Sequence, residues 1–118
     1  MKKNLIAELS FAFALKVIEL FKVLQKENEY VISRQLMRSG TSIGASIEEA
    51  ASAFSRREFA YKHSLALREA REARYWLKLL KQSTLTTVDI STHLNDVDQI
   101  INILSRILIS LKSQLEKE

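Results

Sequence analysis

Few residues of this chain have the types and spacing that catalysis or metal binding requires. The two histidines, His63 and His93, stand without any cysteine, so a thiolate zinc site and a cysteine nucleophile are both excluded. Segment 40–44, GTSIG, matches the letters G-x-S-x-G, but it lies inside a predicted helix and not at the strand-to-helix turn of a nucleophile elbow. Segment 40–46 is rich in glycine and hydroxyl groups, but it lacks the lysine that follows the last glycine of a phosphate-binding loop. The sequence therefore predicts no enzyme, no cofactor, no metal and no small-molecule substrate.

The residues best suited to binding are the cations of segment 55–83, which holds eight Lys/Arg against three acids. Five of these cations follow helical spacing and share one edge of a predicted helix: Arg68, Arg71, Arg74, Lys78 and Lys81. Such a row can attract a phosphate backbone, and the attraction weakens with salt. The alternative, which the sequence alone favours, is a solvated face whose arginines pair with Glu69 and Glu72 three or four residues away. We therefore treat this basic edge as a candidate nucleic-acid or partner site.

Four further residues near the basic edge are candidates for interfaces. Arg38 and Glu72 fall on neighbouring predicted helices, and we expect an ion pair between them, within one bundle or between subunits. Tyr75 and Trp76 are adjacent, so their side chains point in different directions and one of the two rings must lie outside the buried face of the helix. We expect packing at a core or subunit interface, with base stacking as the alternative.

The elements that must position these residues are four helices. Apolar residues recur at spacings of three and four, which predicts helices at approximately 4–28, 33–53, 56–82 and 87–115. The chain has no proline and only two glycines, so the turns of a β protein are missing. We expect an all-α, antiparallel, up-down-up-down four-helix bundle that forms a single domain over residues 1–118.

Small and apolar residues indicate how the helices pack. Gly40 and Gly44 each cost roughly 1 kcal/mol of helix propensity relative to alanine, so we expect them to allow a close helix approach. On the first helix, Phe11, Ile18 and Phe21 widen the apolar face beyond what one neighbour would cover. We predict that this second stripe is an interface of a homo-oligomer.

The cellular setting follows from what the chain lacks. It has no cysteine and no uninterrupted apolar run of membrane-spanning length. Its first residues include Glu8, Lys16 and Glu19 and lack a small-residue cleavage site, so we expect no signal peptide. We expect a cytoplasmic protein without a membrane partner.

Three segments together resemble a known family. They are RSGTSIGASIEEA at 38–50, SRREF at 55–59 and ALREAREARYWL at 66–77. This pattern resembles the four helix bundle protein family, also called the 23S rRNA intervening-sequence protein family, which is related to the accessory variability determinant proteins of diversity-generating retroelements. The positions that match the family pattern are Arg38, Ser42, Ile43, Ile47, Glu49, Phe59, Ala66 and Glu72. Ser46 and Glu69 depart from it.

The resemblance implies a bacterial, non-enzymatic bundle that often assembles as a homopentamer. In the retroelement branch it implies nucleic acid, or a protein that processes nucleic acid, as the partner. Our hypothesis is an oligomeric scaffold that binds RNA or an RNA-associated protein through the basic edge. The alternative is a structural or protein-interaction assembly that binds no nucleic acid.

Overall fold

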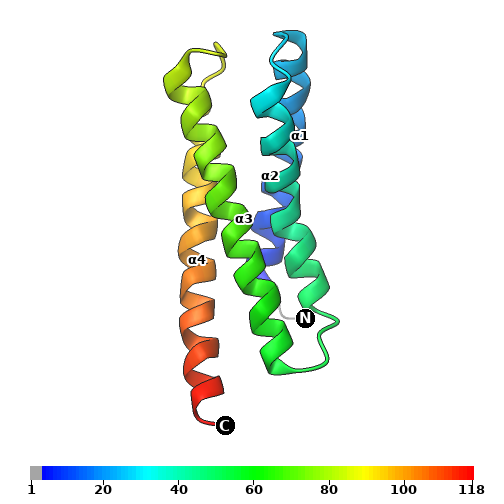
Figure 1. Ribbon diagram of the computed structural model, residues 1–118, viewed down its shortest axis with the longest axis vertical. Helices are drawn as coiled ribbons and strands as arrows, with labels where there is room; N and C mark the ends of the chain where they lie inside the picture. The colour runs from blue at the N-terminus through cyan, green and yellow to red at the C-terminus, as the bar shows by residue number, and fades with distance from the viewer. Residues whose placement is uncertain (1–3) are drawn as a thin grey trace.

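The computed structural model describes residues 4–118, which form four helices joined by short connections (Figure 1). Helix α1 spans Leu5–Lys26, α2 spans Val31–Ala50, α3 spans Arg56–Ser83 and α4 spans Ser91–Glu116. Successive helices run in opposite directions, and no strand occurs among the described residues. The predicted fold class, an all-α up-down-up-down four-helix bundle, is confirmed.

The core is built from the ridges whose spacing predicts the helices. The fully buried members with the largest side chains come from all four helices, and they include Phe13, Leu24, Leu36, Ile43, Leu77, Leu80, Ile100 and Leu104. In the middle of α3 the ridge narrows to Ala66, Ala70 and Ala73, all with no exposed surface. Small side chains at these three positions let neighbouring helices approach α3 closely.

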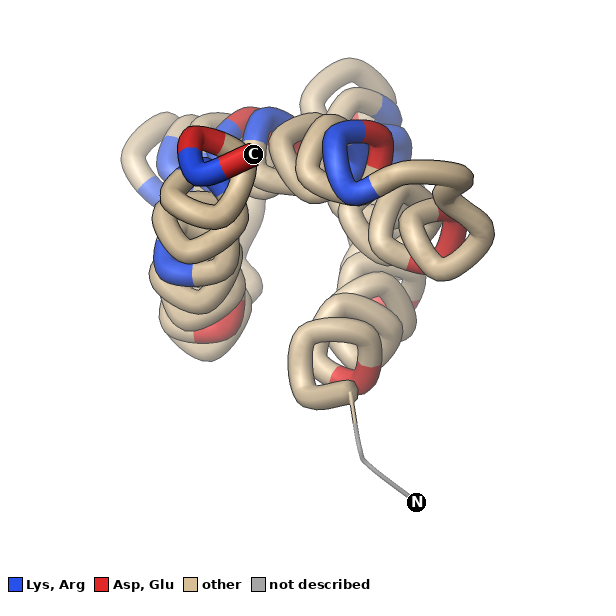
Figure 2. Tube along the Cα trace, turned by 90° about the horizontal axis from the view of Figure 1, so that it is seen from below, with Lys and Arg blue, Asp and Glu red and all other residues tan. Residues whose placement is uncertain are grey.

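The helices follow one another around an arc. Helix α2 packs between α1 and α3, α3 packs between α2 and α4, and no Cα atom of α1 lies within 8 Å of a Cα atom of α3. Helices α1 and α4 have the least extensive contact of the four packed pairs, and Lys16 Nζ lies 2.5 Å from Asp96 Oδ2 where they meet. Seen along the bundle, the first turn of α1 and the end of α4 lie apart (Figure 2). The outer surfaces of α1 and α3 are therefore separate faces.

Helix α2 begins at Val31, two residues before the predicted start, because an acidic side chain caps it. The buried carboxylate of Glu29 accepts hydrogen bonds from the backbone N–H groups of Val31, Ile32 and Ser33 at 3.1, 2.8 and 2.6 Å. These are N–H groups that the first turn of a helix leaves without a partner. The helix also ends earlier than predicted, at Ala50.

Helix α4 begins at Ser91, four residues after the predicted start. The hydroxyls of Thr86 and Thr87, which the sequence places at the helix start, instead donate to the Glu27 carboxylate at 2.5 and 3.0 Å. These bonds lower the pKa of Glu27. The connection is thus attached to the end of α1, and the Asp89 carboxylate accepts from the Ser91 N–H at 3.0 Å.

The start of α3 has a capping box formed by Ser55 and Glu58. Ser55 Oγ accepts from the Glu58 N–H at 3.0 Å. The Glu58 carboxylate reaches back to the N–H of Phe54 at 2.8 Å, one residue before the cap. Both ends of this capping box satisfy helix-start donors.

The two glycines of α2 lie against α1. A Cβ added to Gly40 would come within 2.9 Å of Val17 Cγ2, and one added to Gly44 would lie 3.4 Å from Ser10 Oγ. The close packing that the sequence predicts is therefore tightest at Gly40.

Candidate nucleic-acid interface

The basic edge predicted from the sequence lies along the outer side of α3, toward α4. Arg68, Arg71, Lys78 and Lys81 are exposed. Arg74 is partly covered, and its Nη1 lies 3.3 Å from Asp98 Oδ1 on α4. Among the described residues, this is the only carboxylate within 4.0 Å of the five cations. The edge therefore combines five positive charges with one paired acid.

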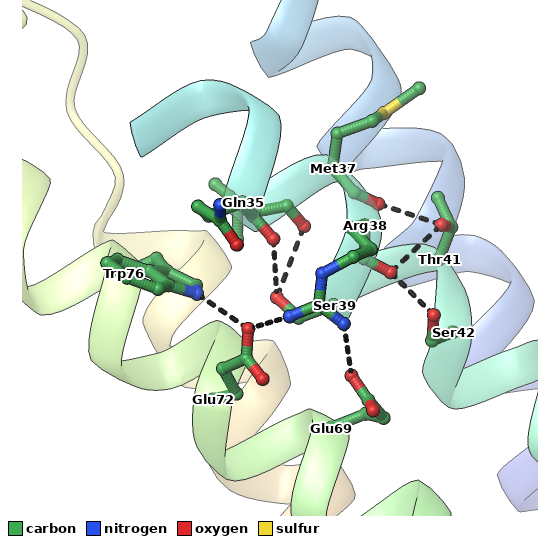
Figure 3. Close-up of polar contacts among 10 residues, drawn as sticks. Gln35, Met37, Arg38, Ser39, Thr41, Ser42, Glu69, Glu72 and Trp76 are labelled. Atoms are coloured by element: carbon green, nitrogen blue, oxygen red, sulfur yellow. Dashed lines mark hydrogen bonds and ion pairs between the residues drawn. The ribbon is translucent and has the colours of Figure 1, made fainter. Parts of the chain in front are cut away.

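The two acids expected to neutralise the basic edge face the other way. Glu69 and Glu72 both reach Arg38 on α2, as Figure 3 shows. Glu69 Oε2 lies 3.5 Å from Arg38 Nη1, while Glu72 Oε2 pairs with Arg38 Nη2 and also accepts from Trp76 Nε1 at 3.0 Å. The Arg38–Glu72 pair expected from the sequence forms within the chain. The alternative pairing of these acids with the arginines of α3 is absent among the described residues.

The reason is the helical period of α3. Positions 69, 72 and 76 lie on the side of α3 that packs beside α2, whereas 71, 74 and 78 lie on the side toward α4 and solvent. Arg38 can hold two carboxylates because its guanidinium presents a planar fork of donors. Glu69, a departure from the family pattern, takes part in this cluster.

A polar groove of about 420 Å³ runs between the basic edge and α4. Its walls combine three cations with amide, carboxylate and apolar groups: Arg74, Lys78, Lys81, Gln82, Leu94, Asn95 and Asp98. Cations and amides in one groove suit the oxygens of a phosphate and the edge of a base. Asp98 pairs with Arg74, so it offsets part of the positive charge of the groove. Lys78 and Lys81 have no carboxylate partner among the described residues and carry the remaining charge.

The adjacent aromatic residues separate as the sequence requires. Tyr75 is 55% exposed, whereas Trp76 is partly buried against the core. Their ring centroids lie 5.1 Å apart at 68°, an edge-to-face arrangement. Tyr61, which is also 55% exposed, is not among the residues predicted from the sequence. Its helical spacing from Tyr75 is the signal that would have found it.

The predicted interface stripe of α1 is largely uncovered. Phe11 is 66% exposed, and Ile18 and Phe21 are partly exposed. Phe11 and Ile18 line an apolar groove of about 480 Å³ between α1 and α2, where Gly44 and Ala45 have side chains too small to fill the space. This face has the composition of a packing surface, and its use as one stays a prediction.

The histidines lie apart and have different surroundings. His63 is buried, with its Nδ1 2.9 Å from the Phe59 carbonyl oxygen. His93 lies where α4 meets α1, and its buried Nδ1 has no hydrogen-bond partner among the described residues. Burial, followed by the charge of Lys16, lowers the pKa of His93. No three His, Cys, Asp or Glu side chains of residues 4–118 converge on a metal-sized site.

None of the helices within residues 4–118 combines the length and apolar character needed to span a bilayer. Most of the basic edge of α3 and the Phe11 ring of α1, which the sequence predicts as binding surfaces, are exposed.

Comparison with known proteins identifies the family of this chain. Curated proteins gave no match. A solved structure with 38% sequence identity superimposes with a TM-score of 0.80 over 87% of this chain and 97% of its own. It is the crystal structure of a protein of unknown function from the S23 ribosomal protein family of Bacteroides thetaiotaomicron. The family model for 23S rRNA-intervening sequence proteins matches residues 2–108. The chain therefore belongs to the 23S rRNA-intervening sequence protein family.

Proposed function

We propose that this chain is a non-enzymatic helical scaffold of the cytoplasm that binds RNA through the basic edge of α3. One observation carries the proposal. Glu69 and Glu72 are paired with Arg38, and neither carboxylate lies within 4.0 Å of a cation of the basic edge. A solvated face with local ion pairs would have shown the reverse arrangement.

The expected binding is electrostatic and depends strongly on salt. Four of the five cations have no carboxylate partner among the described residues, so about four phosphate contacts are available. Each contact with a single strand contributes about −0.7 to the slope of log K against log salt concentration. The predicted slope is therefore about −3, and it becomes steeper if several subunits bind one RNA.

The test is a titration of labelled RNA at low and moderate salt, with two matched double variants. Arg71→Ala with Lys78→Ala removes two charges from the basic edge. Lys26→Ala with Lys112→Ala removes two exposed charges from the ends of α1 and α4. We expect the first pair to weaken binding and to reduce the slope by about 1.4, whereas the second changes neither much. Absence of binding at low salt, or equal losses from both pairs, would overturn the proposal.

A second candidate function, self-assembly, is favoured by the exposed apolar face of α1. The Phe11 ring is 66% exposed and lies beside an apolar groove. A second copy of the chain would cover this apolar surface. The family resemblance makes a homopentamer the expected assembly. In this alternative each copy binds another protein chain and not RNA. The basic edge of α3 then serves only to keep the assembly soluble.

Light scattering tests the assembly. The wild-type protein should have a mass several times that of the 13.6 kDa chain, and Phe11→Asp should lower it. Val31→Asp is the matched control, because Val31 is a similarly exposed apolar residue, at 73%, at the start of α2. A wild-type protein that stays monomeric at high concentration would exclude this candidate.

A further inference from the structure

The outward face of α3 carries two exposed tyrosine rings. Tyr61 and Tyr75 are each 55% exposed. They are fourteen residues apart, so at 100° per residue they lie within about 40° of each other around the helix axis and about 21 Å apart along it. Two large rings thus share one solvent-facing side of a single rigid helix.

The same face carries cations before, between and after the rings. Arg57 precedes Tyr61, Arg68 and Arg71 lie between the two tyrosines, and Lys78 follows Tyr75. All four cations are exposed, and no described carboxylate lies within 4.0 Å of them. The acids of α3 are engaged elsewhere, at the helix cap and at Arg38. Positive charge and aromatic surface therefore alternate along this face, and Glu72, which lies beside it, is paired with Arg38.

The Tyr75 ring is supported from beneath. It lies edge-to-face with Trp76, at a centroid distance of 5.1 Å. The indole is in turn oriented by its hydrogen bond to Glu72 at 3.0 Å, and Glu72 is held by Arg38. This series of contacts from α2 to Tyr75 is visible in part in Figure 3, where the indole and Arg38 meet at the Glu72 carboxylate. A ring held in this way presents a flat face at a lower entropic cost than a free one.

We infer that this face binds single-stranded nucleic acid, with unpaired bases stacked on Tyr61 and Tyr75 and the phosphates held by the intervening cations. The inference rests on the proposed function and narrows its ligand. A duplex hides the faces of its bases, so it can use the cations but not the rings. A single strand can use both, because aromatic stacking is available to every unpaired base. The span of about 21 Å corresponds to about six stacked nucleotides at 3.4 Å each, so a short oligonucleotide reaches both rings.

The test compares three labelled RNAs by fluorescence anisotropy at one salt concentration. They are a 12-nucleotide single strand, the same strand with abasic sites in place of its bases, and a 12-base-pair duplex. For the wild-type protein we expect the intact strand to bind about tenfold more tightly than the abasic strand. Tyr61→Ala with Tyr75→Ala should remove that difference, whereas Tyr61→Phe with Tyr75→Phe should keep it. Tyr30→Ala is the matched control, because Tyr30 is 48% exposed and lies at the start of α2.

The outcomes separate the inference from the proposed function. Salt-sensitive binding of all three RNAs with equal affinity would refute the stacking, and so would an affinity for the intact strand that the alanine pair leaves unchanged. In both cases the electrostatic function stands. Absence of salt-sensitive binding to any RNA would refute the proposed function itself. The comparison of intact with abasic RNA uses the wild-type protein, so it decides the question even if the alanine pair fails to fold.

Discussion

The contact between α1 and α2 at Gly40 allows a quantitative test of why α2 contains glycine. In Gly40→Ala the new Cβ would lie 2.9 Å from Val17 Cγ2 and 3.1 Å from Val17 Cγ1. Val17 has no exposed surface, and a β-branched side chain in a helix keeps essentially one rotamer. The valine therefore cannot rotate away, and the two helices must separate.

Two energies of opposite sign determine the result. Replacing a helical glycine with alanine gains about 1 kcal/mol of helix propensity, and overpacking a core costs about 1 to 3 kcal/mol. Gly40→Ala should therefore change the free energy of unfolding by between about zero and a loss of 2 kcal/mol. At Gly44 the nearest atom is 3.4 Å away, so the same substitution should keep most of the propensity gain. We expect Gly44→Ala to be more stable than Gly40→Ala by about 1 to 3 kcal/mol.

Urea unfolding of both variants, followed by circular dichroism at one protein concentration, measures this difference. A third variant isolates its cause. Combining Gly40→Ala with Val17→Ala removes the two methyl groups that the new Cβ would meet. The double variant should then be less destabilised than the sum of its single changes, by about the overpacking energy of 1 to 3 kcal/mol. Equal stability of Gly40→Ala and Gly44→Ala, or strict additivity with Val17→Ala, would show that close approach is not the reason for Gly40.

Three other contacts give shorter predictions. Glu29→Ala should lower the free energy of unfolding by about 1 to 2 kcal/mol, because three N–H groups lose their acceptor, and Glu29→Gln should lower it less; urea unfolding checks both. A double-mutant cycle with Arg38→Ala and Glu72→Ala should give a coupling of only about 0.5 to 1 kcal/mol, since both side chains are partly exposed; zero coupling would contradict the pair. The pKa of His93 is lowered by burial, so below its unfolded-state value of about 6.5 the unfolded chain binds the proton first. Stability should therefore fall as pH drops through that range, and His93→Asn should show a smaller fall in thermal melts from pH 7.5 to 5.5.

The bundle was predictable from the sequence because each helix repeats its apolar residues over several turns. Phe13, Leu36, Leu77 and Leu104 are all buried where that spacing places them. Helix ends were harder to predict because they depend on contacts between distant residues. The predicted start of α4 was wrong because Thr86 bonds to Glu27, fifty-nine residues earlier in the chain.

The pairing partner of Glu69 and Glu72 could not be predicted from the spacing of charges along α3. Glu72 is within helical reach of several arginines, and sequence rules treat each such pair as a stabilising contact. Arg38 outcompetes them because its packed helix brings a guanidinium fork beside both Glu69 and Glu72. Tyr61 was missed for a different reason. Its spacing from Tyr75 places both rings on one side of a helix, but only the packing of the bundle shows that this side faces solvent.

The packing of α2 connects the two candidate faces of the molecule. Its glycines hold it close to α1, and from the same helix Arg38 reaches α3 and binds Glu69 and Glu72. The positive charge of the outer side of α3 therefore depends on where α2 sits. Since the Phe11 face of α1 and the outer side of α3 are separate surfaces, an assembly built through the Phe11 face would leave the outer side of α3 accessible. Each added subunit would then contribute another basic, tyrosine-bearing helix to one RNA, and the gain in affinity would come from multivalency rather than from new contacts within the chain.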